Sequence, residues 1–494
     1  MTHHRLRPLF AVAAAAACSG ALPAAAHAAG FAKPVVISGS DDASAPRAVI
    51  APDGRTAVLW EREIKVGRRY RSQWRLATGP SPASLGRPTT VTIAGAPHNF
   101  ESPAPFLLAR PDGALVLCVR TGPTKGCSIA PPDGDFGPVI DVRAGKRGFS
   151  AVVRPDNSLL VVYSNSDSLP DGRITGTQMA TATLSAAGVL GAERTLERSA
   201  DEQAYNGAVE PVVAADGTVA IPATLPLAEK RRRLQIGLRF MAPGSDEFGP
   251  VVAIPGAVEE YNNLSLAGGR QLTVAYSAPL QGGKKNAPEV LRVLTLQPGG
   301  VFSSPAPLPT TSTALRGVGG DRVDGFPVAL PDGGILAITQ RSTTAEGDFD
   351  CLNPVAGEVA AGPLGAAPAA AQRLSARGQI ALYPHAAALD DGTVIASWVD
   401  GAAEGSGLFR VEASVRLPGA TAFSAGQRLP SLNETSGHLL ASGGNTAALI
   451  WTSWHKGPTQ WSGHQTVVIS PYTADGRVAP QAPLPKRPGT SCDD

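Results

Sequence analysis

The sequence predicts an all-β protein assembled from repeated four-stranded units. Glycine and proline are abundant, at 55 and 44 residues, whereas aromatic residues make up only 5% of the chain. Short apolar runs alternate with turn residues, and long helical patterns are missing, which is typical of all-β proteins rich in turns. One unit of roughly 55 residues also recurs along nearly the whole chain, and a period of this length indicates a repeat architecture.

The N-terminal residues are expected to form a secretory signal. Arg5 and Arg7 precede an apolar stretch from Leu9 to Ala17, and Ala26-His27-Ala28 matches the small-x-small pattern before a cleavage point. We therefore expect residues 1–28 to be a signal peptide and the protein to be secreted or held in the cell envelope. The apolar stretch is too short to span a bilayer, and no later segment has a transmembrane pattern.

Charge excludes one broad class of partner. The 43 basic residues include two in the expected signal, so the remainder equals the 41 acidic residues. A chain that is nearly neutral lacks the basic excess of a general nucleic-acid binder. No glycine-rich phosphate loop precedes a helical pattern, so nucleotide chemistry has no support either.

The cysteines predict disulfides. Four remain after the signal, and an even number in an exported protein indicates disulfide bonding. Cys118 and Cys127 flank a short hairpin-like segment, so we pair them, which leaves Cys351 to pair with Cys492. No spacing typical of a zinc site is present. Cys18 follows three alanines in a weak lipoprotein-like pattern, so lipid attachment through Cys18 remains an alternative to secretion.

The repeat unit begins with a hairpin. An apolar run, a turn of the Asp-Gly type and a second apolar run recur, as in "RAVIAPDGRTAVLWE" from Arg47 and "HAAALDDGTVIASWV" from His385. Asp-Gly and Gly-Gly suit the positive φ of tight hairpins, so the turn type persists while neighbouring residues change. The eight turn residues are Gly54, Gly113, Asn157, Gly217, Gly269, Gly333, Gly392 and Gly444.

Two further strands complete each unit. A third apolar run such as "LQIGLRFM" follows the hairpin, and an outer element of the form Phe-x-x-Pro ends the unit, as in "DFGPVIDV". The N-terminal "FAKPVVIS", Phe31–Ser38, matches this outer element although no hairpin precedes it, so we expect it to complete the last unit. The prediction is a single β-propeller of about eight blades over residues 29–486, with a C-terminal tail at 487–494. Seven blades, or a string of β-sandwiches, are the alternatives.

In period and strand pattern the mature chain resembles secreted bacterial β-propellers of the sialidase-like or WD40-like kind. The resemblance implies a ring of blades with a ligand site at its central opening. The Gly-His and Trp-Asp pairs of WD40 repeats and the Ser-x-Asp-x-Gly-x-Thr-Trp boxes of sialidases are both missing, so no particular activity follows from it.

Candidate ligand contacts lie at one face. We name the strands of a blade A to D from the axis outward. Because antiparallel strands alternate in direction, the D–A and B–C connections share the face opposite the A–B hairpin turns. The D–A connections lie nearest the axis and carry carboxylate, imidazole, phenol and guanidinium groups, as a polar-ligand site requires. The candidates are His98, Asn99, Glu101, Arg147, Tyr205, Asn206, Glu210, Glu260, Tyr261, Asn262, Arg322, Asp324, Tyr383, His385, Glu434 and His438.

These residues predict a binding protein that recognises a glycan, an anionic envelope polymer or a protein at the central funnel. Several B–C connections are basic, such as "AEKRRRL", which favours an anionic partner. The alternative is an exo-acting glycosidase. The sialidase resemblance would imply a Tyr nucleophile with a neighbouring Glu, which Tyr205 or Tyr261 could supply. No cofactor is expected. The segment "SDSLPDGRITG" departs from the calcium-loop pattern, and a structural calcium ion is kept as an alternative.

Overall fold

The computed structural model describes most of the chain between the expected signal and the C-terminal tail. The described residues are 29–39, 41–66, 69–91, 105–119, 126–132, 134–142, 149–168, 174–199, 210–226, 234–258, 264–268, 272–279, 289–297, 301–303, 306–307, 322–344, 354–363, 371–376, 379–402, 410–429, 435–455 and 464–474.

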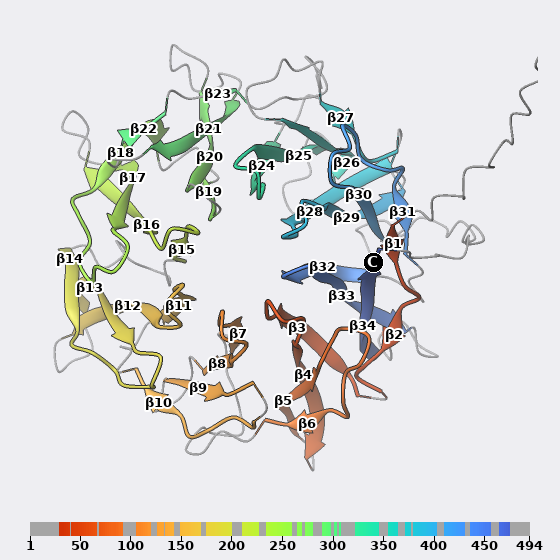
Figure 1. Ribbon diagram of the computed structural model, residues 1–494, viewed down its shortest axis with the longest axis horizontal. Coiled ribbons are helices and arrows are strands. Elements are labelled where there is room, and N and C mark those ends of the chain that lie inside the picture. Colours follow the sequence, from red (N-terminus) through yellow and green to blue (C-terminus); the bar gives the residue numbers. More distant parts are fainter. Residues whose placement is uncertain are drawn as a thin grey trace, which may run out of the picture.

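The described strands form eight separate antiparallel sheets around a central axis (Figure 1). This is the β-propeller that the repeats predict. Strand A lines the axis in each blade: β3 (Ala43–Ile50), β7 (Phe106–Ala109), β11 (Phe149–Val153), β15 (Val212–Val213), β19 (Leu264–Ala267), β24 (Arg322–Ala329), β28 (Gln379–Ala388) and β32 (Thr435–Gly443). Strand B is β4 (Thr56–Val66), β8 (Leu115–Val119), β12 (Leu159–Ser168), β16 (Val219–Pro226), β20 (Thr273–Pro279), β25 (Ile335–Thr344), β29 (Val394–Ala402) and β33 (Thr446–His455).

Strand C is β5 (Arg69–Gly79), β9 (Gly126–Ala130), β13 (Ile174–Leu184), β17 (Leu234–Met241), β21 (Glu289–Gln297), β26 (Pro354–Pro363), β30 (Arg410–Arg416) and β34 (His464–Thr473). The outer strands are mostly short: β6 (Thr89–Thr90), β10 (Ile140–Asp141), β14 (Arg194–Ser199), β18 (Val252–Val258), β22 (Val301–Phe302), β23 (Ala306–Pro307), β27 (Gln372–Arg373) and β31 (Gln427–Arg428). We number the blades in chain order, from blade 1 (β3–β6) to blade 8 (β32–β34).

The N-terminal strand closes the ring, as the sequence predicts. β1 (Gly30–Phe31) and β2 (Val35–Val36) both pair antiparallel with β34, so the first and last described strands share blade 8 (Figure 1). The Phe31 side chain is fully buried in a cluster with Trp451 and Val468. Closure therefore rests on backbone hydrogen bonds and on a buried aromatic ring, which makes Phe31 the main anchor of the joint.

The hairpin turns have the conformation that their sequence demands. Seven of the eight predicted turn residues are described, and each has a positive φ, from 57° at Gly444 to 91° at Gly54 and Gly217. Asn157 is the one residue among them with a side chain, at φ 65°, which fits the tolerance of asparagine for this region. Gly269 lies outside the described residues.

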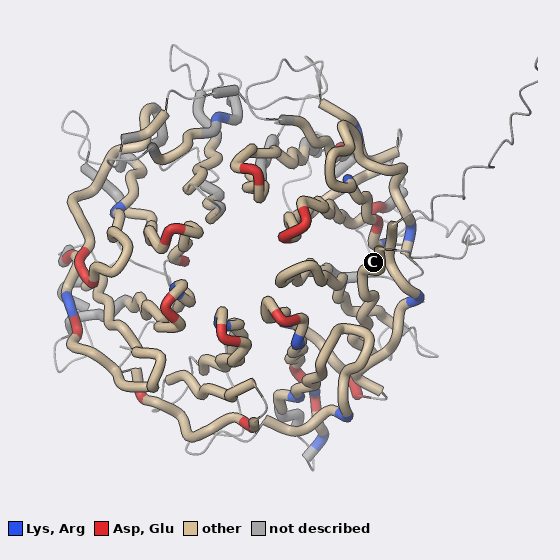
Figure 2. Tube along the Cα trace, in the orientation of Figure 1, with Lys and Arg blue, Asp and Glu red and all other residues tan. Residues whose placement is uncertain are grey.

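Aspartates at the hairpin tips give the inner rim of the ring an acidic character (Figure 2). In each described case the carboxylate accepts a hydrogen bond from the backbone N–H two residues later, at 2.8–3.0 Å. This contact stabilises the turn. The turn contact is therefore sufficient to explain why aspartate recurs at these positions, and no bound ligand is needed. The aspartates are Asp53, Asp112, Asp156, Asp216, Asp332 and Asp391.

The core lies between blades rather than within one blade. Each of seven buried clusters combines side chains from two neighbouring blades. Strand B is covered on both faces, so it has nearly continuous apolar runs such as "TAALIWT". Its aromatic residues pack against the preceding blade and are at most 1% exposed: Trp60, Tyr163, Tyr276, Trp398 and Trp451.

Two equivalent arginines join neighbouring blades at the A–B face. Arg110 donates to the carbonyl of Ala186 in blade 3 at 3.0 Å, and Arg154 donates to the carbonyl of Ser245 in blade 4 at 3.1 Å. Both side chains are buried, so these hydrogen bonds also satisfy groups that water cannot reach. They fix the angle between adjacent blades on the side opposite the candidate contacts.

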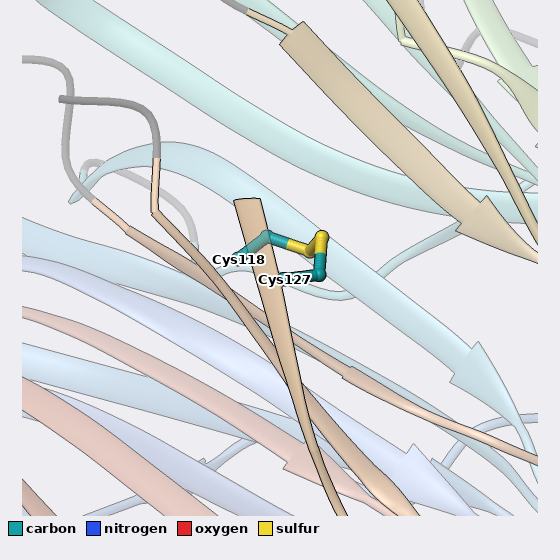
Figure 3. Close-up of a disulfide and its surroundings, with 2 residues drawn as sticks. All are labelled: Cys118 and Cys127. Carbon is teal, nitrogen blue, oxygen red and sulfur yellow. A yellow bond between two sulfur atoms is a disulfide. The ribbon is translucent and has the colours of Figure 1, made fainter. Parts of the chain in front are cut away.

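The predicted disulfide between Cys118 and Cys127 is present (Figure 3). The two residues face each other across β8 and β9, and the S–S distance is 2.03 Å. Cys18, Cys351 and Cys492 lie outside the described residues. Within the described part of the chain, no helix has the length and apolar character needed to cross a membrane.

Blade 7 contains a buried pair of carboxyl groups. Asp400 on β29 and Glu412 on β30 are 3% and 4% exposed. Arg428 lies beside both, with Nε 2.5 Å from Glu412 Oε1 and an Nη 3.5 Å from Asp400 Oδ2. Burial, reinforced by the charge of Glu412, raises the pKa of Asp400 to about 8 against the opposing effect of Arg428. Asp400 is therefore protonated at neutral pH and shares a hydrogen bond with Glu412.

Candidate ligand-binding site at the central channel

Three neighbouring blades share an irregularity in strand A. In blades 7, 8 and 1 the pairing register shifts between Leu382 and His385, between Thr435 and His438, and between Ser44 and Arg47. The inserted residues include Pro384, Pro46 and Gly437. Proline cannot donate to the strand ladder and glycine weakens it, so both favour β-bulges.

The bulges place three side chains at equivalent positions. His385, His438 and Arg47 are each the first residue to pair again with strand B. Two of the bulges hold a non-glycine residue at positive φ, Ala45 at 47° and Tyr383 at 53°. Such backbone costs on the order of 1–3 kcal/mol and persists only where the surroundings enforce it. At Tyr383 the backbone N–H donates to Gln340 of blade 6 at 2.7 Å, which holds this conformation.

The three equivalent residues line one pocket of about 550 Å³. This volume suits a small molecule or one unit of a polymer. Four neighbouring blades supply its wall, from blade 7 through blades 8 and 1 to blade 2. Its polar lining residues are Arg47, His385, His438 and Thr452, and its remaining lining residues are Ala45, Pro46, Ala48, Phe106, Leu107, Leu439 and Leu440.

The two histidines contact each other at the boundary of blades 7 and 8. Their ring centroids are 4.7 Å apart and the rings are nearly perpendicular, at 89°. His438 Nε2 lies 3.0 Å from the hydroxyl oxygen of Ser397. Ser397 is fully buried, so this contact orients the imidazole and does not present a serine nucleophile.

Both imidazoles are neutral at pH 7. Burial lowers the pKa of His438 well below its usual value, and the neighbouring His385 lowers it further. Loss of hydration also lowers the pKa of His385, although a hydrogen bond to the His438 backbone opposes this effect. Arg47 is thus the permanent charge among the pocket-lining residues.

The structure brings together only part of the predicted site. His385 and His438 meet in the pocket, while Tyr383 is 63% exposed two residues from His385. Glu210 is exposed just before β15. Arg322 and Asp324, predicted in a connection, pair instead with Ser342 and Gln340 inside the sheet of blade 6. The other ten candidates lie outside the described residues: His98, Asn99, Glu101, Arg147, Tyr205, Asn206, Glu260, Tyr261, Asn262 and Glu434.

Sequence reasoning missed Arg47. The repeat pattern makes Arg47 only the first residue of a hairpin run, although "APRAVI" and "YPHAAAL" share a proline before a polar residue and an apolar strand. That shared pattern marks the bulge. Among the described residues no group of three or more His, Cys, Asp or Glu could hold a metal ion.

Comparison with known proteins gives distant structural likenesses. No protein-family model and no curated protein matches the sequence. The β-propeller domain of the Trilobed protease from Pyrococcus furiosus is 9% identical, with a TM-score of 0.41, over 79% of this chain and 98% of that one. An α-L-arabinanase from Penicillium chrysogenum is 12% identical, with a TM-score of 0.35, over 89% and 98%. The GH93 α-L-arabinofuranosidase of Fusarium graminearum is 13% identical, with a TM-score of 0.33, over 65% and 91%.

Proposed function

We propose that this chain is a secreted β-propeller that binds a glycan in its central pocket, at the opening where the D–A connections lie. One observation carries the proposal: residues from four neighbouring blades line a single pocket of about 550 Å³ with mixed chemistry. A sugar ring has apolar C–H faces and a polar edge. Such a ring needs both kinds of wall, and a site with a few convergent polar groups among apolar ones supplies them.

The two sides of the pocket differ in chemistry. Phe106 and Leu107 of blade 2 supply an apolar wall, and the exposed Arg47 of blade 1 and His385 of blade 7 supply hydrogen-bonding groups. Tyr383, 63% exposed near this opening, adds an aromatic ring on which a further sugar unit could stack. The Cys118–Cys127 disulfide supports an oxidising compartment, in agreement with export.

The lining residues favour binding over hydrolysis. Most glycosidases use two carboxyl groups that flank the scissile bond. None of the described lining residues is a carboxylate. An exo-acting glycosidase would therefore draw both groups, or a Tyr–Glu pair, from outside the described residues.

A glycan array run beside a panel of chromogenic glycosides tests the proposal. We expect retention of one class of glycan without turnover. The variant His385→Trp fills the pocket from an exposed position and should weaken retention at least 10-fold. Val189→Trp, at an exposed turn residue of blade 3, is the matched control and should bind like the wild type. Equal retention by His385→Trp would refute this pocket, and turnover lost in Tyr261→Phe would establish the glycosidase.

A further inference from the structure

Within the described part of the chain, Arg47 has no acidic partner, unlike Arg62 and Arg75 of the same blade. Arg62 and Arg75 both contact Asp41, at 3.2 and 3.6 Å. The Arg47 guanidinium instead donates to the carbonyl of Pro46, the residue before it, at 2.9 Å, and makes no ion pair with any described residue. It is an exposed side chain that lines the pocket. A guanidinium in this state can pair with an incoming anion.

His438 lines the pocket as a buried ring held by Ser397. His438 is 8% exposed, and its Nδ1 makes no hydrogen bond within the described part of the chain, while Nε2 contacts Ser397. Because Nδ1 is buried away from solvent, the exposed polar groups that face a ligand in this pocket are Arg47 and His385.

The repeat explains how these groups come to face one ligand. Arg47 and His438 occupy equivalent positions in adjacent blades, each immediately after the bulge of strand A. The next blade contributes the apolar Phe106 at the corresponding place. The pocket therefore presents one cation, the exposed imidazole of His385 and one aromatic wall.

We propose that the pocket selects a glycan unit that carries a carboxylate, such as a uronic acid, with Arg47 as its anion contact. This inference rests on the proposed glycan-binding function. The planar guanidinium matches a carboxylate in shape and charge, and can hold it through two parallel hydrogen bonds. The carboxylated pyranose places its ring against Phe106 and its hydroxyl groups toward the exposed His385. Glycerol-phosphate polymers lack such a ring and should bind less well.

A matched pair of probes separates charge from sugar shape. Trigalacturonate and its methyl ester have the same sugar rings and differ in the charge of the carboxyl groups. Isothermal titration should show the acid binding at least 10-fold more tightly than the ester, because hydrogen bonds to charged groups are the strong ones. Affinity for the acid should also fall as salt is added.

Variants identify the residue responsible. Arg47→Gln should lose at least 10-fold in affinity for the acid and change affinity for the ester less than 2-fold. Arg47→Lys should be intermediate, because it keeps the charge but not the planar donor pair. Arg194→Gln is the control: this arginine lies in the outer strand of blade 3 and pairs with Glu247 at 2.7 Å. Its removal should leave both affinities unchanged, and thermal unfolding should show that all three variants fold.

The outcomes distinguish the two proposals. Equal binding of acid and ester, unaffected by Arg47→Gln, overturns the carboxylate preference and leaves glycan binding intact. Tighter binding of a glycerol-phosphate oligomer than of trigalacturonate also overturns it. A failure of the wild type to bind either probe or any glycan on the array overturns both proposals.

Discussion

Replacing Asp400 by asparagine should change how stability depends on pH. In the folded protein Asp400 has a pKa of about 8, raised from 3.8 chiefly by burial. Between these values the folded state keeps the proton and the unfolded state releases it. The contribution of Asp400 to stability is therefore complete below about pH 3.8 and is lost as the pH rises toward 8. The Asp400→Asn variant keeps a donor for Glu412 but has no proton to lose.

The size of the effect follows from the same two values. A difference of one pKa unit corresponds to about 1.4 kcal/mol, so the interval from 3.8 to about 8 sets an upper bound of roughly 6 kcal/mol. Glu412 and Arg428 relax when Asp400 ionises, so we expect roughly half of that bound. Between pH 5 and pH 9 the bound is about 4 kcal/mol, so Asp400→Asn should gain about 2 kcal/mol of stability relative to the wild type over this interval.

Urea unfolding at about pH 5, 7 and 9 measures this difference directly. The control is Glu247→Gln, because the side chain of Glu247 is 80% exposed and its removal should leave the pH profile unchanged. Parallel profiles for the wild type and Asp400→Asn would refute the assignment of the bound proton to Asp400. A stability difference that moves in favour of the wild type as the pH rises from 5 to 9 would refute it as well.

Three further predictions concern ring closure, the disulfide and the histidine pair. Phe31→Ala should destabilise the fold by about 3–5 kcal/mol in urea unfolding, since the ring is fully buried. Val35 is 55% exposed in the same closing segment, so the control Val35→Ala should cost less than about 0.5 kcal/mol. Reduction should destabilise the wild type by roughly 2–3 kcal/mol more than it destabilises Cys118→Ala/Cys127→Ala, because the disulfide joins cysteines nine residues apart. In NMR titrations His438 should remain neutral below its ordinary pKa, because burial disfavours its charged form; a normal titration curve would contradict its buried placement.

The sequence by itself was sufficient for the features that depend on local chemistry. Positive φ at a hairpin turn restricts the residue to glycine or asparagine, so Gly54 and Asn157 were recognisable in every drifted copy of the repeat. Cys118 and Cys127 were paired correctly because a short hairpin keeps them close. The match of Phe31–Ser38 to the outer element was enough to predict closure of the ring.

Only the tertiary structure decided which side chains share the pocket. His385 and His438 are far apart in sequence, and their contact depends on the angle between two blades and on a bulge in each strand. The sequence around Arg47 has no feature typical of a binding residue. Its role follows from the bulge in blade 1, which places Arg47 at the position that the two histidines occupy in blades 7 and 8. The raised pKa of Asp400 likewise depends on burial among groups from three strands of blade 7. These properties depend on how closely segments far apart in the sequence approach each other and on how deeply they are buried. Neither quantity can be read from the order of residues along the chain.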